Sequence, residues 1–85
     1  MADVIVYSSA HCPFCDMAKQ LLERKGVEYQ EIRVDLDPAQ RKEMMQKSRQ
    51  RTVPQIFINN KAVGGYTDLV AIDRAKKLDS LLAQS

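Results

Sequence analysis

The sequence predicts an α/β fold in which a mixed four-stranded β-sheet is flanked by helices, in the chain order β-α-β-α-β-β-α. Three observations predict it: short β-prone runs, amphipathic segments bounded by capping residues, and a paired-asparagine turn between the last two strands. The chain has 85 residues, and 45% of them are hydrophobic. We therefore expect a single domain over residues 1–85 with a modest core.

The first half of the chain has the pattern of a strand, a helix and a second strand. The run Val4–Tyr7 is β-prone and predicts a buried strand. Pro13 fits the first turn of a helix, and Gly26 fits the position just after its end. Three apolar residues give this helix a stripe at helical spacing: Ala18, Leu21 and Leu22. The segment Val27–Val34 predicts the second strand. Its apolar residues lie at odd positions before Glu31 and at even positions after it, so we expect a boundary or bulge near Glu31.

A second helix and a third strand follow. Asp37-Pro38 is a helix-start signal, and Gln40 is placed for a contact like that of a capping box. This helix extends to about Ser48 and is mostly polar. We expect only three of its residues to be buried: Ala39, Met44 and Met45. The apolar run Ile56–Ile58 predicts the third strand.

The last part predicts a hairpin and a final helix. Asn59-Asn60 suits a tight turn, because asparagine tolerates positive φ. A short strand through Ala62 and Val63 then ends at Gly64-Gly65, and Thr67 or Asp68 caps the last helix. One apolar stripe continues to the end of the chain: Leu69, Ile72, Ala75, Leu78, Leu81 and Leu82. This element order is typical of a thioredoxin-like fold.

Composition limits the function classes. The net charge of +2 is too small to make nucleic acid or a membrane the main partner, and no apolar stretch approaches the length of a membrane span. The segment Met1–Val6 lacks the pattern of a signal peptide. Two cysteines without an export signal indicate a reducing compartment, so we expect a cytoplasmic protein. Five basic residues lie close together, either as a solvated face or as a field for an anionic substrate: Arg41, Lys42, Lys47, Arg49 and Arg51.

The motif Cys12-Pro13-Phe14-Cys15 carries the chemistry. Cys12 lies at a helix start, where unpaired N–H groups and the helix dipole stabilise a thiolate. Cys15 lies about one turn inside the helix, so we expect it to be more buried and to remain a thiol. These positions assign the roles: Cys12 attacks a substrate disulfide, and Cys15 resolves the mixed disulfide. Phe14 is expected to be exposed beside the nucleophile.

Two alternatives for the cysteines are weaker. A buried inert pair conflicts with Pro13 and the helix-start context. A structural zinc site needs four ligands, and the chain offers two cysteines and His11, so we expect no metal. His11 fits a loop residue better than a catalytic base, because the helix already favours the thiolate.

Two further segments accept more than one interpretation. Thr52-Val53-Pro54 leads into an apolar strand, and Pro54 fits an ordinary trans proline at a strand start. The alternative is a cis peptide that turns the backbone of Val53 toward a substrate. Gly64–Asp68 fits a simple capped turn, or a helix N-terminus that holds a carboxylate, with Asp68 pairing a substrate ammonium.

Taken together, the three segments resemble the glutaredoxin family, in particular the short bacterial dithiol glutaredoxins of the glutaredoxin-three type. The resemblance covers Val4 to about Leu82 and is carried by three motifs: Cys12-Pro13-Phe14-Cys15, Thr52-Val53-Pro54-Gln55-Ile56-Phe57-Ile58 and Gly64-Gly65-Tyr66-Thr67-Asp68-Leu69. It implies glutathione as a cosubstrate, with no tightly bound cofactor.

The resemblance also implies roles for single residues. Cys12 forms the mixed disulfide with glutathione, and Arg41 meets its glycine carboxylate. The residues implied to bind glutathione are Phe14, Arg41, Thr52, Val53, Pro54, Gly65, Thr67 and Asp68. Among these, Val53 offers its backbone with Pro54 cis, and Thr67 and Asp68 hold the γ-glutamyl group. One departure is Ser9, where many members have lysine; Arg51 is the candidate replacement.

These implications predict a monomeric, glutathione-dependent reductase of protein disulfides and glutathione mixed disulfides. Its electrons come from NADPH through glutathione reductase, and ribonucleotide reductase is a client implied by the resemblance alone. Two other functions remain open. A glutathione-bridged iron–sulfur cluster carrier is disfavoured by the stiffness of Pro13. A redoxin reduced by thioredoxin reductase is disfavoured by Thr67-Asp68.

Overall fold

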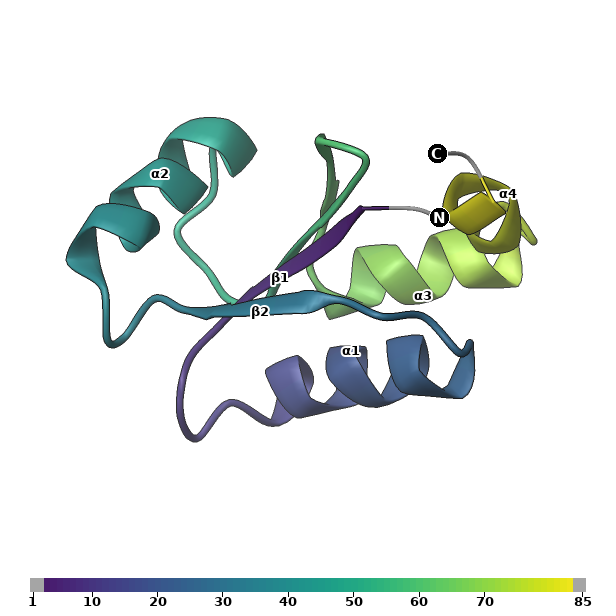
Figure 1. The fold of residues 1–85 in the computed structure, drawn as a ribbon, viewed down its shortest axis with the longest axis horizontal. Coiled ribbons are helices and arrows are strands. Elements are labelled where there is room, and N and C mark those ends of the chain that lie inside the picture. Colours follow the sequence, from purple (N-terminus) through teal and green to yellow (C-terminus); the bar gives the residue numbers. More distant parts are fainter. Residues whose placement is uncertain (1–2, 84–85) are drawn as a thin grey trace.

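The fold is a mixed four-stranded sheet with helices on both faces (Figure 1). The computed structural model describes residues 3–83, so both ends of the predicted domain 1–85 lie outside the described residues. The elements, in chain order, are β1 (Val4–Ser8), α1 (Pro13–Arg24), β2 (Gln30–Arg33), α2 (Pro38–Ser48), β3 (Gln55–Ile58), β4 (Lys61–Gly64), α3 (Tyr66–Arg74) and α4 (Leu78–Ala83). No helix within residues 3–83 is long and apolar enough to cross a membrane.

The strands lie in the order β2-β1-β3-β4, with β1 parallel to β2 and the other two pairings antiparallel. Because side chains alternate along a strand, β1 sends Val4 and Val6 to one face and Tyr7 to the other. The first face packs against α1, α3 and α4, and the second against α2 (Figure 1). The predicted sheet and its helical cover are therefore confirmed.

The second face of the sheet is covered by the helix α2. The bounds of α2 are those predicted, and its N-cap Asp37 accepts a hydrogen bond from the backbone N–H of Gln40 at 3.2 Å. Met44 is fully buried and Met45 packs partly beside it. The expectation for Ala39 was wrong: it lies in the first turn of α2 and is exposed.

The second strand is shorter than predicted. Pairing with β1 begins at Ile5↔Gln30, while Val27 and Tyr29 pack on the core without joining the sheet. The register of this pair is continuous, so the alternative of a bulge near Glu31 is wrong. The sheet instead has its register shift between β3 and β4, at Ile56/Phe57.

The hairpin between β3 and β4 is as predicted, because Asn59 and Asn60 both have positive φ, of 52° and 67°. This is the backbone that a two-residue turn of type I′ requires.

The single last helix predicted from the apolar stripe is divided into α3 and α4. The break lies at Lys76, where φ is 60°, and the N–H of Lys77 closes the turn on the carbonyl of Ile72 at 2.9 Å. The change in direction places Leu78 in the core at 0% exposure. A straight helix would pack only one face against the core. The two short helices, which differ in direction, place the apolar side chains of both against the same core cluster.

Candidate active site

Cys12 and Cys15 form a disulfide at the N-terminus of α1, with their Cα atoms 5.2 Å apart. Cys12 is the N-cap of α1, and its sulfur accepts a hydrogen bond from the backbone N–H of Cys15 at 3.2 Å. Cys15 is 0% exposed, whereas Cys12 is only half-buried. This confirms the predicted difference in burial between the two cysteines. The N–H group that caps the sulfur is also able to stabilise a thiolate.

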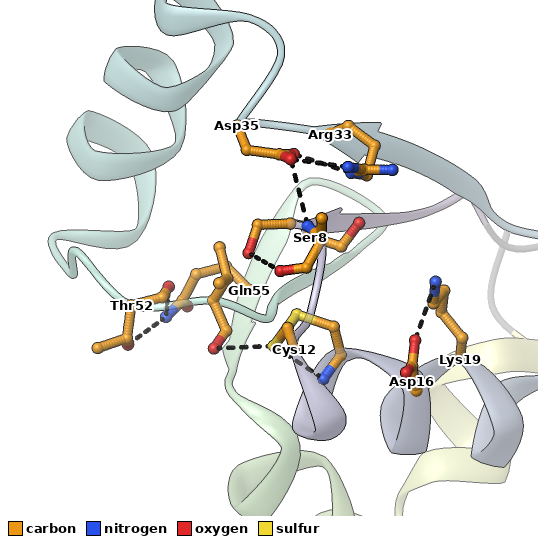
Figure 2. The surroundings of a disulfide bond; sticks show 12 residues. Ser8, Cys12, Asp16, Lys19, Arg33, Asp35, Thr52 and Gln55 are labelled. Atoms are coloured by element: carbon orange, nitrogen blue, oxygen red, sulfur yellow. Dashed lines mark hydrogen bonds and ion pairs between the residues drawn. A yellow bond between two sulfur atoms is a disulfide. The ribbon is translucent and has the colours of Figure 1, made fainter.

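The loop before Cys12 is tied to the end of β2 (Figure 2). The backbone N–H of Ala10 donates to Oδ2 of Asp35 at 3.3 Å, and Arg33 donates to both oxygens of Asp35 at 2.8 and 2.7 Å. The hydrogen bonds from Arg33 lower the pKa of Asp35 to about 2, so this carboxylate is charged at any working pH. His11 follows in the left-handed region, with φ 55°, and is an exposed loop residue as expected.

A second polar group lies next to the strand that leads into the site. Glu31 Oε2 accepts hydrogen bonds from Ser8 Oγ at 2.6 Å and from Lys19 Nζ at 2.9 Å. These two bonds lower the pKa of Glu31, and the bond to Glu31 raises the pKa of Lys19. Lys19 also pairs with Asp16 on α1 at 3.5 Å. The group therefore joins α1 to β1 and β2 directly behind the cysteine loop.

The segment before β3 faces the disulfide. The Val53–Pro54 peptide bond is cis, so the ordinary trans interpretation of Pro54 was wrong. The carbonyl oxygen of Val53 lies 3.9 Å from the sulfur of Cys12. Thr52 is an exposed residue, and the amide nitrogen of Gln55 donates a hydrogen bond to its carbonyl at 3.0 Å (Figure 2).

The start of α3 adjoins the same segment. The N-cap is Gly65, so the expectation that Thr67 or Asp68 caps this helix was wrong. Both lie in its first turn, and Asp68 Oδ2 accepts the N–H of Gly65 at 3.0 Å. A Cβ on Gly65 would lie 3.5 Å from the carbonyl oxygen of Pro54, which shows how closely α3 approaches the cis-proline segment.

Two aromatic rings bridge the helix starts. Phe14 is 56% exposed, as predicted, and its ring stacks on Tyr66 with centroids 6.1 Å apart and an interplanar angle of 22°. Phe14 belongs to α1 and Tyr66 is the first residue of α3, so the stack joins the starts of these two helices.

The remaining expected residues are less constrained. Arg41 is exposed on α2, and within residues 3–83 its side chain has no hydrogen-bond or ion-pair partner. Thr67 is exposed as well.

Within the same described range, no three potential ligands among His, Cys, Asp and Glu lie close enough together to hold a metal ion. A cavity of about 460 Å³ lies beside Val27 and Tyr29, at the opposite end of α1 from the cysteines.

Three residues around the site were missed by the sequence analysis. Gln55 appeared only as part of a motif, and its polar side chain at the start of an apolar strand was the available signal. Tyr66 likewise appeared only as part of a motif, and Asp35 did not appear at all, because their partners Phe14 and Ala10 lie far away in the chain.

Comparisons with known proteins identify the family of the chain. The Glutaredoxin family model matches residues 4–63. A Pseudomonas aeruginosa protein named Glutaredoxin is 52% identical over 83 residues, covering 98% of this chain and 99% of that protein. Escherichia coli Glutaredoxin 3 is 48% identical over 82 residues, covering 96% of this chain and 99% of that protein.

Solved structures give the same result for the fold. The buckwheat glutaredoxin–glutathione complex superposes with a TM-score of 0.90 at 31% identity, covering 98% of this chain and 78% of that chain. Glutaredoxin from Brucella melitensis superposes with a TM-score of 0.85 at 50% identity, covering 96% of this chain and 89% of that chain. The thioredoxin-like fold predicted from the sequence is confirmed. With its cysteine pair at the start of α1, the chain belongs to the glutaredoxin family, whose members are generally thiol–disulfide oxidoreductases.

Proposed function

We propose that the protein is a glutathione-dependent oxidoreductase that reduces glutathione mixed disulfides and protein disulfides. The observation that carries the proposal is the position of Cys12: half-buried, at a helix N-cap, with a backbone N–H on its sulfur at 3.2 Å. The likeness to a plant glutaredoxin described as a glutathione complex supports the choice of cosubstrate.

With a glutathionylated protein, the Cys12 thiolate attacks the sulfur of the glutathione moiety. The old S–S bond breaks, the client sulfur leaves and takes a proton from solvent, and Cys12 holds glutathione as a mixed disulfide. A second glutathione, as its thiolate, attacks this bond. Glutathione disulfide leaves and the Cys12 thiolate is restored. Over the cycle, one glutathione thiol has been consumed, the client thiol has been released, and the client's mixed disulfide has been exchanged for glutathione disulfide.

With a protein disulfide, the intermediate joins Cys12 to the client, and the buried thiol of Cys15 resolves it. Cys15 loses its proton and attacks the Cys12 sulfur, so the client leaves as a dithiol and the Cys12–Cys15 disulfide forms. Two glutathione molecules then reduce that disulfide. The electrons come from NADPH through glutathione reductase, and ribonucleotide reductase is a plausible client.

For glutathione itself, we propose a site along the Val53–Pro54 segment and the start of α3. The main chain of Val53 meets the cysteinyl part, and Thr67 and Asp68 hold the γ-glutamyl group. The close approach of Gly65 to Pro54 supports a continuous surface between these segments. The remaining proposed contacts are Thr52, which precedes Val53, and Phe14 and Arg41, which lie on α1 and α2. We further propose that the protein acts as a monomer in the cytoplasm.

The test is coupled turnover with glutathione, glutathione reductase, NADPH and the mixed disulfide of glutathione and mercaptoethanol. We expect wild type to turn over and Cys12→Ser to fall below about one thousandth of its rate. Cys15→Ser keeps this activity but loses the reduction of a protein disulfide. An inactive wild type rejects the glutathione proposal. Activity with thioredoxin reductase, or iron bound after anaerobic purification, would then favour a different redoxin role or a cluster carrier.

A further inference from the structure

We propose that Gln55 is a positioning residue, whose side-chain amide fixes the main chain of Thr52 and Val53 opposite Cys12. The proposal deepens the proposed function and rests on it, since it concerns the wall of the glutathione site formed by Val53. Gln55 does not touch the reacting sulfur. It acts through the segment that does face the sulfur.

The contacts of Gln55 converge on that segment (Figure 2). Its side chain is 1% exposed, and its amide nitrogen donates to the carbonyl of Thr52 at 3.0 Å and to Gln50 Oε1 at 3.1 Å. The hydroxyl of Thr52 is a third acceptor at 3.3 Å. Meanwhile the backbone of Gln55 is fixed in the sheet opposite Tyr7. Val53 thus lies between Thr52, which is held by the side chain of Gln55, and Gln55 itself, whose backbone is held in β3.

The segment needs such support because regular structure does not supply it. From Arg49 to Pro54 the chain belongs to neither a helix nor a strand, so it lacks the repeating hydrogen bonds of those elements. Irregular segments without such bonds are free to move unless side chains hold them. The carbonyl of Val53 nevertheless lies 3.9 Å from the Cys12 sulfur, a spacing that a substrate sulfur and its neighbouring peptide must match.

Gln55 is a poor stabiliser of the fold, which separates positioning from stability. Its acceptors belong to Gln50 and Thr52, two residues that are exposed as a whole, so we expect water to reach these acceptors when the amide is removed. Its own Oε1 is buried, and no residue among 3–83 donates a hydrogen bond to it. A buried acceptor without a partner opposes folding, whereas an apolar side chain of the same shape does not. Methionine at this position therefore removes the support without lowering the stability.

The experiment compares wild type, Gln55→Met and Gln55→Leu, with Gln50→Ala as the matched control. Gln50→Ala removes one acceptor of the same amide but leaves its bond to the Thr52 carbonyl. We expect kcat/KM for the glutathione–mercaptoethanol mixed disulfide to fall about tenfold in both Gln55 variants. The alkylation of Cys12 by iodoacetamide, including its pH midpoint, should stay as in wild type, because this small reagent needs no contact with Val53. The melting temperature should not fall, and Gln50→Ala should match wild type throughout.

Backbone dynamics provide a readout that does not depend on glutathione. The ¹⁵N order parameter of Val53 should fall from about 0.85 to below about 0.6 in the Gln55 variants, with Phe57 in β3 unchanged. If wild type does not turn over glutathione disulfides, the proposed function fails and this measurement alone decides the positioning role. Unchanged kcat/KM in active protein, an unchanged order parameter at Val53, or two variants that do not fold would each overturn the proposal.

Discussion

The helices α1 and α3 both begin at the site, but their first turns are closed by different groups. In α1 the capping atom is the sulfur of Cys12, which accepts the N–H of Cys15. In α3 the cap is Gly65, and Asp68 on the helix itself returns to accept the Gly65 N–H. The positive N-terminal end of α3 is therefore already paired with a carboxylate of the same helix, that of Asp68. At the positive end of α1 the acceptor is the sulfur of Cys12, so the helix dipole and the N–H group are able to stabilise a thiolate there.

The residues that precede the two helices also differ. α3 follows Gly64, whose φ of 116° is a conformation for glycine, while α1 follows His11 at φ 55°. The glycine needs no outside support. The histidine lies in a loop whose neighbouring residue, Ala10, is tethered to Asp35. The start of α3 is thus encoded locally, whereas the approach to α1 depends on a distant strand end.

The largest effect is expected from Gly64→Ala, which breaks the start of α3. Alanine is strained at this φ, and its Cβ would collide with the carboxylate of Asp68. We expect roughly 3 kcal/mol of destabilisation in urea unfolding. The control is Gly26→Ala, where φ is also positive but no atom lies within 4 Å of the new Cβ. It should cost about 1 kcal/mol. Equal losses at the two positions would mean that the contact with Asp68 is unimportant.

A middle-sized effect is expected when the sulfur cap of α1 is replaced. Serine at position 12 keeps a capping oxygen, and alanine does not, so in reduced protein Cys12→Ala should be about 1 kcal/mol less stable than Cys12→Ser. Both variants should be inactive. The reference pair is Asp37→Ser and Asp37→Ala at the N-cap of α2, where Asp37 bonds the N–H of Gln40. Equal stabilities for the two Cys12 variants would show that the side chain at position 12 does not cap α1.

The same contrast explains which features the sequence predicted. The capping position of Cys12 and the burial of Cys15 follow from local signals, namely a proline and a three-residue spacing at a helix start. The bounds of α2 and the Asn59-Asn60 turn are local in the same sense. Such features depend on the backbone preferences of a few neighbouring residues.

The features that were missed depend on contacts between distant segments. Gln55 and Asp35 act on the site only once β3 and β2 have taken their places beside β1. The break between α3 and α4 was hidden by an apolar stripe that continues through it. It is held by Lys25, whose ammonium pairs with Asp73 at 2.8 Å and Asp79 at 3.3 Å, one on each helix. Neither register nor such long-range pairing can be inferred from local periodicity.

The smallest expected effect concerns the tether before α1. Because the folded-state pKa of Asp35 is lowered to about 2, from an unfolded value near 3.8, the charged form favours the folded state. That stabilisation is complete above the unfolded pKa and is lost as the pH falls through the folded pKa. Asp35→Asn should therefore be less stable than wild type at pH 6, and the difference should shrink toward pH 2. Asparagine has one acceptor oxygen in place of two, so the substitution removes the charge and one of the two acceptors that Arg33 and the Ala10 N–H share.

Urea midpoints of the two proteins at a series of pH values measure this difference. Glu43→Gln is the matched control, because it removes a charge from the exposed Lys47–Glu43 pair on α2, away from the cysteine loop. Only Asp35→Asn should also slow the reaction of Cys12 with the mixed disulfide, since only Asp35 is bonded to the chain that leads into the nucleophile. A stability difference that is the same at pH 6 and pH 2 would place the contribution of Asp35 in the lost hydrogen-bond acceptor and not in its charge. In that case the approach to α1, like the start of α3, would not depend on a distant charge.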